Sequence, residues 1–155
     1  MSINNQANPN KIKRDSVLAY ITVTVDTLLP YSNCKDQQRI LPPLNEFVNS
    51  FIEKSKLPIP ILLITLLYLT RLKTKLPSTA KGAYDTPYRL FLASVLTSSK
   101  YLSDLNSLTS IRVCEMIQRQ YSVREINSME RSFLSLLSYD LRVTADQLQE
   151  LNKSL

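Results

Sequence analysis

Apolar residues recur along this chain at the spacing of helices. After the prolines at positions 42 and 43 they follow the i, i+3, i+4, i+7, i+8 pattern of an amphipathic helix, which has one apolar face and one polar face. This pattern predicts a helix that starts just after the two prolines and packs against a core. Its apolar face consists of Leu44, Phe47, Val48, Phe51 and Ile52.

Two further stretches are apolar on nearly every side. The first, PIPILLITLLYLTRLKTKL, stays apolar until Arg71. The second, PYRLFLASVLTSSKYLSD, follows Thr86 as a helix N-cap and has Pro87 in its first turn. A helix without a polar face is surrounded by other elements. The sequence therefore predicts two central helices, joined by the loop LPSTAKGAYD.

Polar residues mark the starts of two later helices. A shorter amphipathic segment covers residues 108–120. Ser122 and Glu125 then form an S-x-x-E capping box ahead of REINSMERSFLSLLSYDL, residues 124–141. Thr144 and Gln147 repeat the device as T-x-x-Q, which predicts a terminal helix.

The segment VLAYITVTVDTLL, residues 17–29, fits two patterns. Ile21, Val23 and Val25 alternate as in a strand, whereas the apolar residues from Val17 to Leu28 also form a helical face. We expect a helix, because the chain offers no second strand to pair with this segment.

The predicted fold class is all-α, with one domain in a chain of 155 residues. We expect a flexible polar tail over residues 1–15 and a C-terminal helix or tail over residues 144–155. Between them, residues 16–143 are expected to form one domain of about five core helices, with an extra N-terminal helix and a short C-terminal helix.

The composition excludes several kinds of site. The chain has no His and one Gly, so a Gly-rich phosphate loop, a His-based triad and a His metal site cannot be built. We expect no cofactor and no metal. Cys34 and Cys114 lack a C-x-x-C partner, which is typical of reduced thiols in a cytosolic or nuclear protein. The longest uncharged run, Leu57 to Thr70, is shorter than the about 20 residues of a bilayer span, so no membrane association is expected.

A net charge of +6 is compatible with an anionic partner. The densest basic stretch has no acidic residue until Asp85. Its cations could contact a substrate or another anion, or they could lie at a helix end, where cations interact favourably with the negative end of the helix. These cations are Arg71, Lys73, Lys75 and Lys81.

Two opposite charges fall on apolar helix faces. Glu130 lies within the apolar arc of residues 124–141, and Lys100 projects between the directions of Ala93 and Leu96 in the second central helix. Because burial of an unpaired charge costs several kcal/mol, we expect Lys100 and Glu130 to pair. The pair is either a structural salt bridge or, since buried pairs are poor stabilisers, a functional feature.

The motifs that carry these two charges resemble the cyclin box. LFLASVLTSSKYLSD is similar to an alanine-rich helix that ends in a lysine, and MERSFLSLLSYDL to a later helix that carries a glutamate. More narrowly, PPLNEFVNSFIEKSKLPIPILLITLLYLTRL, TPYRLFLASVLTSSKYLSD and INSMERSFLSLLSYDL resemble the PCL and phosphate-response (Pho-type) group of fungal cyclins, and the related cyclin Y group. The resemblance covers about residues 16–143.

This resemblance implies a regulatory subunit and no enzyme activity of the chain itself. Cyclins bind a cyclin-dependent protein kinase and move its regulatory helix inward, so that the catalytic groups of the kinase come into place. The implied partners are a Pho-type cyclin-dependent kinase, in a 1:1 heterodimer, and the kinase substrates that the cyclin helps to select. The implied setting is cell-cycle or phosphate signalling in the nucleus and cytoplasm.

The resemblance also implies a kinase-binding site. Lys100 and Glu130 match the lysine and glutamate that hydrogen-bond backbone groups beside the regulatory helix of the kinase. Asp104 matches an aspartate common in the PCL group, for contact with the activation segment or the substrate. The apolar contact positions match Tyr101, Leu134, Tyr139 and Leu141.

The chain also departs from the family pattern. The M-R-x-I-L-x-D-W start of mitotic cyclins is absent, we expect no second helical repeat, and SLTSIRVCEM stands where many group members carry a tryptophan. An alternative function is a cyclin-fold domain that binds nucleic acid or the transcription machinery, in the manner of transcription factor IIB. The positive charge favours this alternative, whereas the lack of a C-x-x-C motif and of a basic helix face counts against it.

Overall fold

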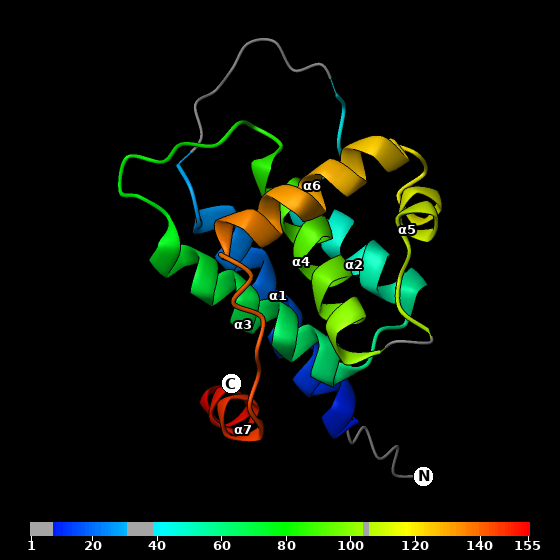
Figure 1. The fold of residues 1–155 in the computed structure, drawn as a ribbon. Coiled ribbons are helices and arrows are strands. Elements are labelled where there is room, and N and C mark those ends of the chain that lie inside the picture. Colours follow the sequence, from blue (N-terminus) through cyan, green and yellow to red (C-terminus); the bar gives the residue numbers. More distant parts are fainter. Residues whose placement is uncertain (1–7, 31–38, 104–105) are drawn as a thin grey trace, which may run out of the picture.

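The computed structural model describes residues 8–30, 39–103 and 106–155. Within these ranges the chain forms seven helices and no strand, so the prediction of an all-α fold is confirmed (Figure 1). The helices are α1 (Pro9–Thr27), α2 (Leu44–Ser55), α3 (Ile59–Lys75), α4 (Thr86–Leu102), α5 (Ser110–Met116), α6 (Val123–Leu136) and α7 (Ala145–Ser154).

Helix α4 lies in the middle of the molecule and contacts α1, α2, α3 and α6 (Figure 1). Every residue from Leu90 to Ser99 is buried, as the lack of a polar face predicts. Its buried serines have hydrogen-bond partners: the Ser94 hydroxyl donates to the Phe91 carbonyl at 2.8 Å, and the Ser99 hydroxyl accepts from the Leu108 N–H at 2.9 Å. Small side chains with satisfied hydroxyls let neighbouring helices pack closely without a polar penalty.

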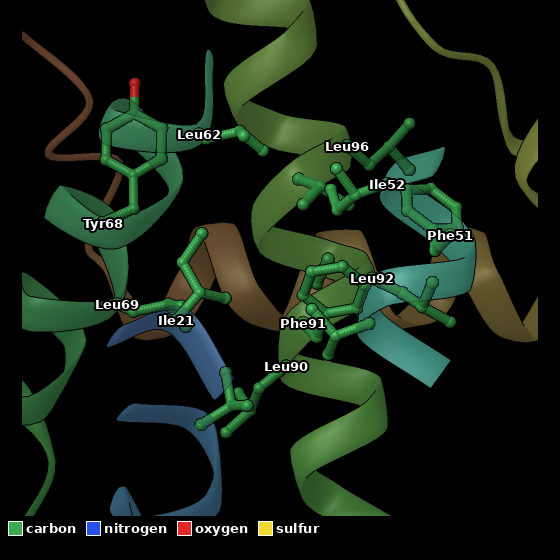
Figure 2. Close-up of a cluster of buried hydrophobic side chains, with 14 of the residues drawn as sticks. Ile21, Phe51, Ile52, Leu62, Tyr68, Leu69, Leu90, Phe91, Leu92 and Leu96 are labelled. Carbon is green, nitrogen blue, oxygen red and sulfur yellow. The ribbon is translucent and has the colours of Figure 1, made fainter. Parts of the chain in front are cut away.

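The hydrophobic core surrounds α4 on the sides of α1, α2 and α3 (Figure 2). Phe91 of α4 makes edge contacts with Phe51 and Phe47 of α2, at ring-centroid distances of 5.5 and 6.2 Å. Figure 2 shows Tyr68 of α3 at the margin of this cluster, with its hydroxyl directed away from the labelled apolar side chains. Tyr68 therefore combines a buried ring with a polar group that reaches another segment.

Helix α1 begins earlier than the sequence indicated. Asn8 caps it by accepting a hydrogen bond from the Asn10 N–H at 3.0 Å, and Pro9 occupies the first turn. The helical interpretation of residues 17–29 is confirmed as far as Thr27. The expected flexible tail over residues 1–15 is wrong for residues 9–15, which are helical, whereas residues 1–7 lie outside the described ranges. Lys13 adds a tertiary contact here, because its ammonium donates to the Asn152 carbonyl of α7 at 2.6 Å.

Both predicted capping boxes are present, at the starts of α6 and α7. The end of α6 differs from the expectation, because the helix stops at Leu136 instead of continuing to residue 141. Ser138 and Tyr139 have left-handed backbones, with φ of 54° and 56°, which turn the chain away from the helix axis. Helix α5 is likewise shorter than residues 108–120, since it ends at Met116.

A polar cluster joins the start of α4 to the start of α6. The buried Tyr121 hydroxyl donates to Asp85 at 2.9 Å, and Arg89 also donates to Asp85, at 3.1 Å. Arg39 pairs with Glu125 and stacks on the Tyr121 ring at 4.4 Å. Burial, followed by the charge and hydrogen bond of Asp85, raises the pKa of Tyr121 above its ordinary value. The cluster therefore connects Arg39, Asp85 and Tyr121, which lie outside the helices, to α4 and α6.

Replacement of Tyr121 by Phe tests this cluster. The variant leaves one acceptor site of the buried Asp85 unfilled, so we expect a loss of about 1–3 kcal/mol in the free energy of unfolding at pH 7. Above about pH 10 the unfolded wild-type chain releases the phenol proton while the folded chain retains it, so wild-type stability falls there by up to about 1.4 kcal/mol per pH unit through this group.

The difference in stability between wild type and Tyr121→Phe should therefore narrow as the pH rises above about 10. Urea denaturation at a series of alkaline pH values measures it. Tyr20→Phe, at an exposed position of α1, serves as the control. A difference that stays constant across this range would contradict the account.

Candidate protein-binding surface

Lys100 and Glu130 form the ion pair that the sequence predicts. The Lys100 ammonium donates to both carboxylate oxygens of Glu130, each at 2.9 Å, and joins the last turn of α4 to α6. The expectation that Lys100 is buried is wrong, since its side chain is 45% exposed, whereas that of Glu130 is 14% exposed. Lys100 lies in the last turn of α4. Helical periodicity places its side chain on the side of α4 that faces the core, but at this end of the helix the side chain is open to solvent.

The ion pair leaves one N–H donor of Lys100 free to bind another acceptor. An ammonium group has three N–H donors, and two of them are directed at the Glu130 carboxylate. The third is available on an exposed side chain and suits an acceptor such as a backbone carbonyl. A surface ion pair contributes only about 0–1 kcal/mol to folding, so stability by itself gives little reason for the arrangement.

The apolar residues predicted beside the pair differ in exposure. Leu134 is half-buried and lies one turn after Glu130 on the same side of α6. Tyr139 is 66% exposed, and its N–H donates to the Leu134 carbonyl at 3.0 Å, which keeps it next to that helix end. Leu134 and Tyr139 thus extend the surface from the ion pair along α6. Asp104 lies outside the described residues.

Tyr101 and Leu141 are engaged within the chain. The Tyr101 ring contacts the Tyr68 ring edge-on at 6.2 Å, and its hydroxyl accepts from the Val143 N–H at 3.0 Å. Leu141 is partly buried against the core, and its carbonyl accepts from the Tyr68 hydroxyl at 2.8 Å. Both residues hold the segment after α6, and Tyr101 remains exposed enough to present part of its ring to a partner.

The basic stretch does not form one patch of four cations. Arg71 donates to the carbonyls of Asp140 and Arg142 at 2.9 and 2.6 Å, and Lys75 donates to the Leu137 carbonyl at 2.6 Å. Lys73 and Lys81 are exposed, and neither makes an ion pair with any residue in the described ranges. Two of the four charges that favoured an anionic ligand are therefore used inside the chain.

The sequence interpretation missed two features of this region. Tyr68 lies in the stretch that is apolar until Arg71. Because Tyr68 and Arg71 are three residues apart, they lie on one helix face, and this spacing could have indicated a shared polar contact. A hollow between α4 and α6 was also missed. It lies on the other flank of α6 and is lined by Thr86, Arg89, Leu90, Ala93, Ser128, Met129, Ser132, Phe133 and Leu136.

The geometry of this surface supports binding to another molecule. No group of three or more Cys, Asp or Glu in the described parts of the chain is placed to hold a metal ion. Among the helices of the described residues, none combines the length and apolar character that a membrane crossing requires. The surface presents one charged donor with a fixed partner and apolar side chains towards the end of α6, a composition that suits a specific protein interface.

Removal of both charges tests how little the ion pair contributes to the fold. Because Lys100 is half exposed, we expect Lys100→Met combined with Glu130→Leu to change the free energy of unfolding by less than about 1 kcal/mol. Urea denaturation followed by circular dichroism measures the change. A loss of several kcal/mol would instead identify the pair as a structural salt bridge.

The sequence matches a family described as Cyclin, N-terminal domain, over residues 16–142. It is similar to three proteins of Saccharomyces cerevisiae. PHO85 cyclin-1 is 30% identical over 142 residues, which cover 86% of this chain and 50% of that protein. PHO85 cyclin-2 is 29% identical over 131 residues (84% and 42%), and PHO85 cyclin-9 is 27% identical over 144 residues (92% and 47%). The chain thus spans about half the length of the curated relatives it matches.

Proposed function

The chain belongs to the cyclin N-terminal domain family, and we propose that it binds a PHO85-type cyclin-dependent kinase as its regulatory subunit. The family that the sequence motifs resemble is thereby confirmed, and the three relatives described above are named as PHO85 cyclins. The observation that carries the proposal is the exposed ion pair of Lys100 and Glu130, held between α4 and α6 with a donor to spare.

In the proposed complex, each member of the pair has a distinct task. Glu130 fixes the position of the Lys100 ammonium, which reduces the conformational entropy lost when a partner binds. The remaining N–H of Lys100 donates to a backbone carbonyl beside the regulatory helix of the kinase. Leu134 and Tyr139 extend the contact surface from the pair towards the end of α6 and exclude water from this hydrogen bond on that side.

The cyclin supplies contacts and no reacting group. Its binding favours the kinase conformation in which the regulatory helix has moved inward and the lysine, glutamate and Mg²⁺-binding groups of the kinase itself are aligned. The contact residues all belong to one chain and to neighbouring parts of α4 and α6, which fits a 1:1 complex. Selection of substrates is part of the proposal, with the exposed Lys73 and Lys81 as the cations available to an acidic substrate.

Kinase binding tests the proposal directly. We expect the purified chain to bind Saccharomyces cerevisiae PHO85, and Lys100→Ala to weaken that affinity about 30-fold or more, because it removes a charged donor at the interface and leaves Glu130 without its partner. Isothermal titration calorimetry with purified kinase measures the affinity, and phosphate transfer to a peptide measures activation.

The matched control is Lys153→Ala, which removes an exposed lysine from the last turn of α7 as Lys100→Ala does from the last turn of α4. This control should bind with unchanged affinity. The combined Lys100→Met and Glu130→Leu chain should be folded and should bind poorly. If that folded double variant bound the kinase with wild-type affinity, the ion pair would have no role in kinase binding. Phosphate transfer by the cyclin chain alone would overturn the assignment as a regulatory subunit.

A further inference from the structure

The segment that follows α6 is held by three side chains from α3 and α4, which we call the clasp: Tyr68, Arg71 and Tyr101. Between them they bind the backbone of four consecutive residues. Arg71 donates to the carbonyls of residues 140 and 142, Tyr68 donates to the carbonyl of residue 141, and Tyr101 accepts from the N–H of residue 143. Residues 140–143 form no helix of their own, so these bonds replace the backbone partners that a helix would supply.

Arg71 is the centre of the clasp. Besides its two carbonyl contacts, its guanidinium donates to the Gln147 side-chain oxygen at 3.3 Å, and it lies 5.8 Å from the centre of the Tyr68 ring. Gln147 belongs to the capping box of α7, so one side chain joins the segment after α6 to the start of the next helix. Only 14% of the Arg71 side chain is exposed. A planar guanidinium can bind several acceptors in fixed directions, which a lysine ammonium in its place would do less well.

The clasp holds a turn whose backbone is unfavourable by itself. Ser138 and Tyr139 both adopt left-handed conformations, which residues with a Cβ rarely do. Such conformations persist where the surrounding contacts fix the chain on both sides. Lys75 holds the Leu137 carbonyl before the turn, and Arg71 holds the Asp140 carbonyl directly after it. The exposed Tyr139 side chain is therefore carried by a turn that α3 keeps in place.

We propose that Arg71 is a positioning residue for the kinase-binding surface, which acts by fixing the turn that presents Tyr139. The inference rests on the proposed function for the identity of the partner, a kinase. The fixing of the turn by Arg71 is a property of the free chain and can be measured without the kinase. The inference assigns Arg71 a role different from contact with an external anion, since its guanidinium is largely covered, donates to two carbonyls of its own chain and already lies 4.0 Å from the Asp140 carboxylate.

The first test measures the turn without any partner. In Arg71→Gln, we expect amide hydrogen exchange in residues 138–144 to become about tenfold faster or more, while the amides of α4 and of α6 up to Glu130 keep their protection. Arg112→Gln, at an exposed position of α5, is the matched control and should leave exchange in residues 138–144 unchanged. Unchanged exchange in the Arg71 variant would overturn the inference, whether or not a kinase binds.

The second test asks whether Arg71 acts through Tyr139. With purified PHO85, Arg71→Gln should weaken binding about tenfold in the wild-type chain and less than about twofold in a chain that already carries Tyr139→Ala. Equal losses in both backgrounds would overturn the inference. Tyr121→Phe controls for general destabilisation, because it weakens a cluster near the start of α4, about 22 Å along the helix from Lys100, and should leave affinity unchanged.

Two outcomes separate the inference from the proposed function. A wild-type chain that does not bind PHO85 contradicts the proposed function, whereas normal binding that is insensitive to Arg71→Gln contradicts the positioning role alone. If Arg71→Gln fails to fold, Arg71→Lys replaces it in both tests. Arg71→Lys keeps the positive charge but loses the planar guanidinium that donates to two carbonyls, so amide exchange at residues 138–144 should still become faster. It should weaken kinase binding in the wild-type background and have little effect in the Tyr139→Ala background.

Discussion

The burial of α4 on all sides constrains the rest of this structure. A helix without a solvent-facing side can carry charge only near its ends, because a charge in the middle would have to be desolvated. Two charged clusters of the described residues accordingly lie at the two ends of α4, and a third, Arg71 and Lys75 with Asp140, lies beside the end of α3. Asp85 and Arg89 mark the start of α4 and Lys100 its last turn, with small or apolar side chains between them.

Helix α6 supplies the acidic partner at both ends of α4, and its environment differs between them. Glu125, in the first turn of α6, contacts Arg39 and Arg89 around the buried Tyr121. Glu130 meets Lys100 where the neighbouring helices have ended and solvent reaches the ammonium. The cations at the two ends are exposed to a similar degree, 44% for Arg89 and 45% for Lys100, but the charges at the start of α4 surround a buried hydrogen bond, from Tyr121 to Asp85. A buried hydrogen bond suits a cluster that stabilises the fold, whereas a half-exposed ammonium with a fixed partner suits a group that binds another molecule.

The binding surface also depends on α3, which does not contribute to it directly. In the segment after α6, the carbonyls of residues 140, 141 and 142 accept hydrogen bonds from tyrosine and arginine side chains of α3, so its position depends on these side chains. Any shift of α3 relative to α6 would therefore move Tyr139 together with the start of α7. Tyr68, at the margin of the core in Figure 2, and Arg71 thus connect core packing to the position of the proposed binding surface.

The sequence by itself determined the helices, both capping boxes and the pairing of Lys100 with Glu130, because these depend on spacing within one helix or on two opposite charges that need each other. Only the tertiary structure decided where α4 emerges from its neighbours, and hence that Lys100 is exposed. It also decided that Arg71 binds carbonyls 69 and 71 residues further along the chain. Every residue carries a backbone carbonyl, so no residue type in a sequence marks which of them an arginine will find.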